Sequence, residues 1–402
     1  MSASTFAQAI LDVKHLAYAK SHLKDAAYSQ AFKSLISQAD VDLLLKPLSV
    51  MSKEYIPASG SKHDYVSLAR YAWPDDTQPD GLPYVMRDGV SNPELKKFDR
   101  NKLSTMSNAV YRLSLAYYFS GEEKYAQKAT ELLRVWFIDK KTMVNPNLRF
   151  AQHIPGVADG RCYGVIDTYS YVEMLDGVQL LEHSTSFTPK DSKQLKNWFS
   201  QLLKWLLTHP QAIEESNQKN NHATAYDVQV AAYALYTGNK KVFNEVVNNF
   251  PKRRIATQIM SDGKQPHELR RTLAFGYSQF NLTHIIDLML MLKHQGLDFK
   301  QYCVSGEHSF FKAMDFIAPY MGKSVNDWPY KQISGWEDKQ EEMAKDFYRT
   351  FLLDENRKDY LQVYRNVKKR DWNDLFVLTY EKPTKLDNAM AHADEQLRYA
   401  LE

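Results

Sequence analysis

Cysteine, long apolar runs and charge of one sign are all scarce in this sequence, and each shortage excludes a class of protein. The 402 residues include only two cysteines, Cys162 and Cys303, which could form one disulfide or stay as buried thiols. No CxxC or Cys/His cluster suggests zinc. No stretch of 18 apolar residues occurs, so no membrane span is expected. The net charge of +3 is too small to indicate a nucleic-acid-binding protein, but it is compatible with an acidic ligand.

The amino terminus also lacks a basic segment followed by an apolar one, which a secretory signal peptide would need. Either the protein is cytosolic, or a signal peptide has been removed. Residues 1–5 have the form of a start methionine joined to a mature terminus. We therefore expect a periplasmic or secreted protein.

Aromatic residues, in contrast, are plentiful: 25 Tyr, 19 Phe and 7 Trp make up 13% of the chain. Core packing accounts for most of the phenylalanines. An excess of tyrosine is also common in clefts that offer sugars a flat apolar face with a hydroxyl edge.

Helical periodicity dominates the chain. Apolar residues at three-four spacing predict helices over 6–38 with breaks, 102–119, 122–137, 166–181, 190–208, 223–237, 241–260, 275–295, 307–320, 338–351 and 358–366. Short polar turns, such as Ser120-Gly121, predict antiparallel hairpins. Without a known repeat motif or a linker, residues 1–402 are expected to form a single all-α domain, an incomplete α/α toroid of about six or seven hairpins.

Two long segments do not fit this pattern. Residues 56–94 are dense in proline and glycine, and residues 139–163 are also irregular. Long irregular segments in a compact domain are usually functional loops. We expect both to line an active site.

Two clusters of polar residues could carry chemistry. Asn221 and His222 precede a predicted helix, where capping is the simpler interpretation. Arg270 and Tyr277 lie seven residues apart, so a continuous helix would place both on one side. β-Elimination from a uronate needs a group that neutralises the carboxylate, a base for the C5 proton and an acid for the leaving O4. Asn or Arg, His or ionised Tyr, and Tyr suit these three roles.

These residues also resemble the catalytic Asn-His…Arg…Tyr set of the alginate lyase superfamily. The stretches His63-Asp64-Tyr65…Trp73-Pro74-Asp75, Gly81-Leu82-Pro83-Tyr84…Arg87-Asp88-Gly89 and Asn145-Pro146-Asn147-Leu148…Gly160-Arg161 are similar to its other signatures. The pattern is most similar to polysaccharide lyase family 38. The resemblance covers roughly residues 60–300 and implies an (α/α) toroid that needs no metal and no organic cofactor, with an anionic polysaccharide as its partner.

The resemblance also assigns roles. Asn221 would neutralise the carboxylate, and Tyr277 would be the acid and could also serve as the base. His222 would be the base or would activate Tyr277. Arg270 would hold the phenolate or the substrate carboxylate. Family 5 alginate lyases carry a further arginine four residues before the tyrosine; that position is Leu273 here, and Arg271 could replace it.

Residues of the two irregular segments, with Arg271, are expected to bind substrate: His63, Tyr65, Trp73, Tyr84, Arg87, Gln152, His153, Arg161 and Arg271.

Two other functions remain open. A toroid-fold glycoside hydrolase would need a pair of carboxylic acids; Glu94, Asp159, Asp167 and Glu268 are available, but in no recognisable arrangement. A non-catalytic uronate-binding protein would bind oligosaccharides and release no product. Oligomeric state and the preferred uronate are not predicted.

Overall fold

The contrast between two neighbouring helices explains how the chain builds layers. In a computed structural model that describes residues 8–367 and 371–401, helix α8 (Asn221–Thr237) is buried on nearly every side. Its sequence is correspondingly rich in alanine and apolar residues. Helix α9 (Lys240–Phe250) buries only one stripe, formed by Val242, Phe243, Val247 and Phe250. A helix that is apolar all round belongs inside, and an amphipathic one belongs outside.

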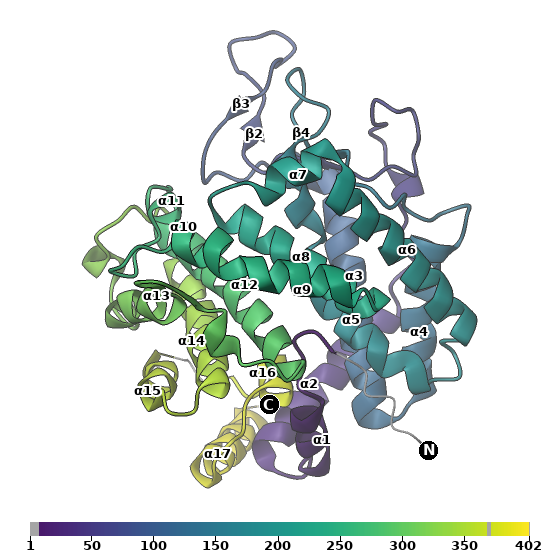
Figure 1. Cartoon of the computed structure of the whole chain (residues 1–402). Helices are drawn as coiled ribbons and strands as arrows, with labels where there is room; N and C mark the ends of the chain where they lie inside the picture. The colour runs from purple at the N-terminus through teal and green to yellow at the C-terminus, as the bar shows by residue number, and fades with distance from the viewer. Residues whose placement is uncertain (1–7, 368–370, 402) are drawn as a thin grey trace.

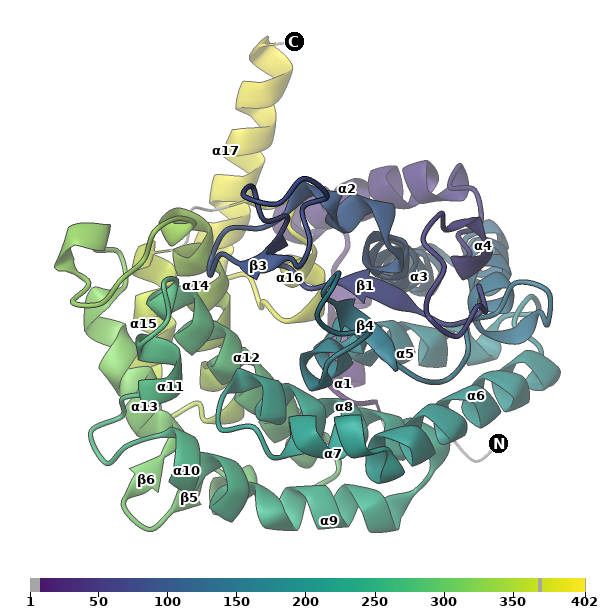
Figure 2. The same ribbon diagram turned by 90° about the horizontal axis from the view of Figure 1, so that it is seen from above.

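An inner row of helices runs around the molecule in chain order. It consists of α3 (Asp99–Ser120), α5 (Tyr171–Leu180), α8, α12 (Ala274–His294) and α14 (Trp336–Leu353), each in contact with the next. Their arrangement as an incomplete ring is visible from above (Figure 2).

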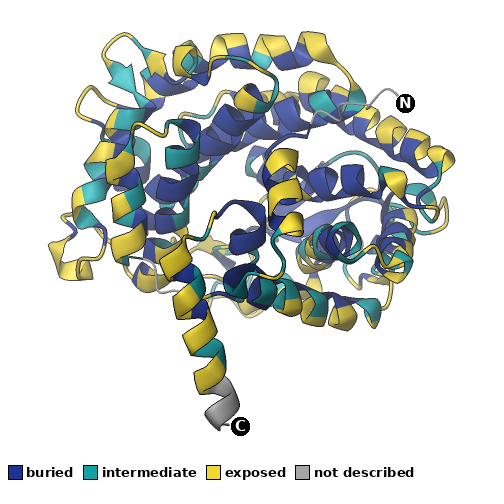
Figure 3. Ribbon diagram, turned by 90° about the horizontal axis from the view of Figure 1, so that it is seen from below, coloured by how far each residue is buried: buried dark blue, intermediate teal, exposed yellow. Residues whose placement is uncertain are grey.

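An outer row alternates with the inner one along the chain (Figure 1). It consists of α4 (Glu123–Leu133), α6 (Pro189–Thr208), α9, α13 (Phe310–Ile317) and α15 (Lys358–Val367). The outward faces of these helices are exposed while the inner helices are buried (Figure 3). This arrangement confirms the predicted all-α toroid of hairpins.

Further helices complete the chain. Helices α1 (Val13–Ser21), α2 (Ala26–Leu43), α16 (Leu375–Thr379) and α17 (Lys385–Leu401) lie together, with α2 contacting α3, α16 and α17. Three further short helices, α7 (Pro210–Ser216), α10 (Ala256–Gln258) and α11 (Pro266–Leu269), connect longer elements. The sequence patterns did not predict α7, α11 or α16, because such short segments carry little periodicity. The 17-residue α17 was also missed.

Several predicted boundaries are wrong for local reasons. The helix expected over 241–260 runs from Lys240 to Gln258, but Pro251 begins a π-helical turn, up to Ile255, that separates α9 from α10. A two-residue hairpin, β5 (Val304–Ser305) with β6 (His308–Ser309), delays the helix expected from residue 307 to Phe310. The predicted start at residue 6 lies outside the described residues. So does the basic run Lys368-Lys369-Arg370, whose charge predicts a solvated face.

The two irregular segments meet at one end of the toroid. Strand β1 (Val66–Leu68) pairs in parallel with β4 (Phe150–His153), which joins one segment to the other. Strand β2 (Ala72–Trp73) pairs with β3 (Val85–Met86) to form a projecting hairpin (Figure 1).

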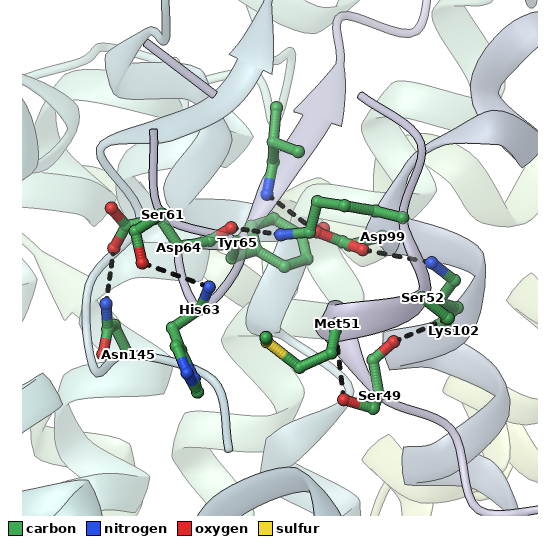
Figure 4. A network of polar contacts seen from close by, with 12 residues as sticks. Ser49, Met51, Ser52, Ser61, His63, Asp64, Tyr65, Asp99, Lys102 and Asn145 are labelled. Atoms are coloured by element: carbon green, nitrogen blue, oxygen red, sulfur yellow. Dashed lines mark hydrogen bonds and ion pairs between the residues drawn. The ribbon is translucent and has the colours of Figure 1, made fainter. Parts of the chain in front are cut away.

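A buried polar network fixes the first segment to the inner helix α3. Lys53 Nζ lies 2.6 Å from Asp99 Oδ2, and both side chains are fully buried. The same Asp99 oxygen accepts the Val66 N–H, at 3.1 Å, so the ion pair orients the start of β1. Asp64 accepts a hydrogen bond from Asn145 of the second segment at 2.9 Å (Figure 4). These bonds hold both segments in register with the toroid.

One hydrophobic cluster extends through the described residues, from Ala9 to Ala391. Cys162 and Cys303 are both buried free thiols, which settles the alternative left open by the sequence. Within the described ranges, none of the helices has the length and apolarity needed to cross a membrane.

Candidate active site

A cavity of about 370 Å³ lies where the irregular segments cover the first turns of α8 and α12. The first segment contributes Arg70, Tyr71, Met86 and Asp88, together with Arg100 at the start of α3. The second contributes Gln152, Arg161, Tyr163 and Ile166. The helical wall is formed by Asn220, Asn221, His222, His267, Arg270, Arg271, Tyr277 and Phe280.

The phenol of Tyr277 is held by two hydrogen-bonding groups. Its oxygen lies 2.7 Å from the Tyr71 hydroxyl and accepts a hydrogen bond of 3.0 Å from Arg271 Nη2. The Arg271 guanidinium carbon also lies 3.9 Å from the centre of the Tyr277 ring. Burial, with Tyr71, raises the pKa of Tyr277 well above that of a free phenol, although Arg271 opposes the rise. Tyr277 is therefore protonated in the free protein at neutral pH.

Arg271 is in turn held by the loop that follows β3. Its Nη2 lies 2.6 Å from Asp88 Oδ1, and Thr272 Oγ1 donates to the other Asp88 oxygen at 2.9 Å. Gly89 has a φ of +81°, and a Cβ there would lie 2.6 Å from Thr272 Oγ1. Only glycine allows this close approach of the loop to the chain preceding α12.

The first turn of α8 fixes the amide of Asn221. The neighbouring Asn220 caps the helix, since its side chain accepts the His222 N–H at 3.3 Å. Asn221 is 1% exposed, and its main-chain N–H and Nδ2 donate to the two carboxyl oxygens of Glu268 at 2.7 and 2.8 Å. Burial raises the pKa of Glu268 in spite of these bonds.

His222 is oriented by a second buried carboxyl group. Its Nδ1 lies 2.8 Å from Glu215 Oε1, and the Glu215 side chain is fully buried. The ring also makes an edge contact with Tyr163, with 4.8 Å between centres. With the Nδ1 hydrogen donated to Glu215, the lone pair resides on Nε2, which has no hydrogen-bond partner among the residues described.

The cavity wall is strongly basic. It carries five arginines and only one carboxylate, Asp88. Arg161 donates to Gln152 Oε1 at 2.8 Å, and Gln152 has a φ of +52°, a strained conformation for a residue other than glycine. Such strain is common where a side chain is held for function. A basic cavity of this kind suits a polyanionic ligand.

Comparisons with known proteins identify the family of the chain. The family model described as "Alginate lyase" matches residues 49–328. The chain belongs to the alginate lyase family. An alginate lyase from Bacteroides ovatus is similar at 45% identity, with a TM-score of 0.91, over 93% of this chain and 99% of that one. None of the curated proteins matches.

More distant structures share the fold. Alginate lyase A1-III from Sphingomonas species A1 has 12% identity and a TM-score of 0.56 over 90% of this chain and 97% of that one. A variant of alginate lyase A1-III solved with a tetrasaccharide has 14% identity and a TM-score of 0.58, over 94% and 99% of the two chains. This alginate lyase family member is thus a polysaccharide lyase that acts on uronic-acid polymers. The finer resemblance to polysaccharide lyase family 38 stays a prediction.

All four residues predicted to be catalytic line the cavity of this family member: Asn221, His222, Arg270 and Tyr277. Three of the predicted binding residues, Gln152, Arg161 and Arg271, line it as well. Arg270 and Tyr277 do not lie on one continuous helix, because α11 ends at Leu269 and α12 begins at Ala274. Arg271 rather than Arg270 reaches the Tyr277 oxygen.

The other six predicted binding residues do not line the cavity and have other partners. His63 bonds to the Met143 carbonyl and Tyr65 to Asp167, while Trp73 bonds to the Val90 carbonyl. Tyr84 donates to Glu94, Arg87 pairs with Asp76, and His153 bonds to Tyr55. These bonds hold the segments to one another and to the toroid, so the six residues shape the cavity from outside it.

The sequence patterns did not indicate Tyr71, Arg70, Arg100, Tyr163 or Glu215 as parts of the site, and they named Glu268 only as an available acid for a hydrolase. No local pattern distinguishes Tyr71 from the other residues of the first irregular segment, and its partner Tyr277 lies 206 residues later in the sequence. Glu215 and Glu268 are marked only by their positions, seven residues before His222 and three before Arg271.

Proposed function

We propose that this lyase cleaves 1,4-linked uronic-acid chains, alginate or glucuronan, by β-elimination in the cavity around Tyr277, and that it does so outside the cytoplasm. The observation that carries the proposal is the environment of the Tyr277 oxygen. A protonated phenol lies between Tyr71 and the Arg271 guanidinium, in a basic cavity that also presents Asn221 and His222.

In this mechanism, Asn221 donates to the uronate carboxylate at the cleavage site. Hydrogen bonds to that group stabilise the negative charge that develops as C5 loses its proton. Arg270 is exposed, and its guanidinium has no hydrogen-bond partner among the described residues, so it supplies further positive charge. Arg70 and Arg161 bind carboxylates of neighbouring sugars.

The proton transfers follow from the protonation states. His222 Nε2 takes the C5 proton, and Glu215 stabilises the imidazolium that forms. The C5–H electron pair forms the C4–C5 double bond as the C4–O4 bond breaks. Tyr277 gives its proton to the departing O4, and Arg271 stabilises the resulting phenolate. Atoms and charge balance without a co-reactant.

The alternative in which Tyr277 is both base and acid requires an ionised phenol. Burial disfavours that state in the free protein. A hydrolase is less well supported, because the single carboxylate in the cavity wall, Asp88, is paired with Arg271. Two carboxyl groups facing one bond would be needed.

Ultraviolet absorbance distinguishes these reactions, because elimination makes a conjugated 4,5-unsaturated uronate and hydrolysis makes none. The protein is incubated separately with polymannuronate, polyguluronate and glucuronan. A rise in absorbance with one polymer identifies the preferred uronate. New reducing ends without a rise would indicate hydrolysis, and neither signal with any polymer would contradict the proposed substrates.

A further inference from the structure

The amide of Asn221 has one polar atom whose bonding is incomplete. The main-chain N–H and Nδ2 of Asn221 both donate to Glu268, but Oδ1 is buried and has no hydrogen-bond partner among the described residues. Leaving a buried acceptor unpaired is unfavourable. Glu268 itself is 1% exposed and lies outside the cavity lining, so it holds Asn221 from behind.

The same arrangement also conflicts with the role proposed for Asn221. An ionised Glu268 would place a negative charge on one edge of the amide while the uronate carboxylate binds the other edge. Like charges that share a buried site disfavour each other. With Nδ2 bonded to Glu268, the Asn221 amide would also direct its acceptor, Oδ1, toward the uronate carboxylate, which is itself an acceptor.

A proton on Glu268, together with a flip of the Asn221 side-chain amide, removes both conflicts. The two ends of an asparagine amide have nearly the same shape, so their positions can exchange without repacking. A protonated carboxyl group donates one hydrogen bond and still accepts another. We propose that Glu268 is a positioning residue that carries a proton, donates it to Asn221 Oδ1 and accepts the Asn221 main-chain N–H, so that both amide hydrogens face the uronate carboxylate. This inference rests on the proposed function of Asn221.

The surroundings of Glu268 are consistent with a neutral carboxyl group. Burial raises its pKa, while the hydrogen bonds from Asn221, and His222 and Arg271 nearby, oppose the rise. Arg271 is already paired with Asp88, and His222 with Glu215. Neither side chain forms a hydrogen bond with the Glu268 carboxyl group in the described structure.

Glutamine has the shape of a protonated glutamate and cannot ionise, so Glu268→Gln tests the proposed protonation state directly. In Glu268→Gln, the amide oxygen must accept the Asn221 N–H, so its nitrogen can only donate to Oδ1. We expect kcat on the preferred polymer to stay within about threefold of the wild type and to lose any alkaline decline caused by ionisation of Glu268. Glu268→Ala should lower kcat about tenfold or more, because Asn221 loses its partner.

A measurement without substrate separates this inference from the proposed function. When a carboxyl group has a higher pKa in the folded protein than in the unfolded one, the protein loses stability as pH rises from the unfolded pKa toward the folded pKa. In urea unfolding, Glu268→Gln should therefore gain stability relative to the wild type as pH rises above the unfolded glutamate pKa of about 4.3. If the variant is instead destabilised at every pH and loses as much kcat as Glu268→Ala, Glu268 acts as an ionised acceptor and the inference is wrong. If Glu268→Gln gains stability but the wild type produces no elimination, the protonation of Glu268 is supported and only the proposed function is refuted.

Discussion

Arg271 offers the most specific test of how the site activates Tyr277. Its guanidinium lies against the ring and donates to the phenol oxygen at 3.0 Å. In the proposed mechanism this bond strengthens as the oxygen becomes a phenolate, so it acts mainly in the transition state. Arg271→Ala removes it without changing the phenol.

The expected size of the effect follows from the charge on both partners. Hydrogen bonds to charged groups contribute about 1.5–3 kcal/mol, which corresponds to a fall in kcat of about 10- to 150-fold. Arg271→Lys keeps the charge but loses the planar contact with the ring, so it should recover only part of the rate. Initial rates are measured as the increase of ultraviolet absorbance over a range of polymer concentrations.

The chain contains a matched control. Arg357 lies 3.7 Å from the centre of the Tyr360 ring and pairs with Asp359 at 2.7 Å, far from the cavity lining. Arg357→Ala should leave kcat unchanged. A change confined to KM in Arg271→Ala would mean that Arg271 binds the substrate carboxylate, and a loss of less than threefold would refute its action on Tyr277.

Three further predictions address other parts of the account. Asn221→Ala should lower kcat strongly, because the amide acts on the developing enolate; an effect on KM alone would contradict that role. Chelator treatment should leave activity unchanged, since the proposed steps use only side chains, and a loss restored by metal would overturn this expectation. Although burial opposes it, hydrogen bonds from Arg134 and Thr188 lower the pKa of Asp191 to about 2. Asp191→Asn should therefore destabilise the protein in urea near neutral pH, and the difference from the wild type should shrink as pH falls through 4 toward 2; a constant difference would contradict the assigned pKa.

The helical part of the fold could be predicted because its signals are local. The buried composition of α8, the apolar stripe of α9 and the left-handed glycines at the ends of α3 and α8 are all contained in short stretches of sequence. Elements that depend on distant partners were missed. The four residues of α11 and the strand pair β1 and β4 have no periodicity of their own.

The same division applies to the site. Asn221, His222, Arg270 and Tyr277 were found because their order and spacing resemble a family pattern. The hydrogen bonds that define their states could not be found in this way. Tyr71 to Tyr277, Glu215 to His222 and Glu268 to Asn221 are contacts that only the folded toroid brings about. For the same reason, loop aromatics such as Trp73 and Tyr84 were expected in the cavity, although they bond within the loops.

Turnover by Tyr277→Phe tests the central claim most directly. The substitution removes one oxygen and the two hydrogen bonds that reach it, and leaves the ring and its contact with Arg271 in place. The account predicts that the variant folds, binds an oligouronate in calorimetry and produces no unsaturated uronate. Substantial residual elimination by the folded variant would show that another group protonates O4, and the role assigned to Tyr277 would be wrong.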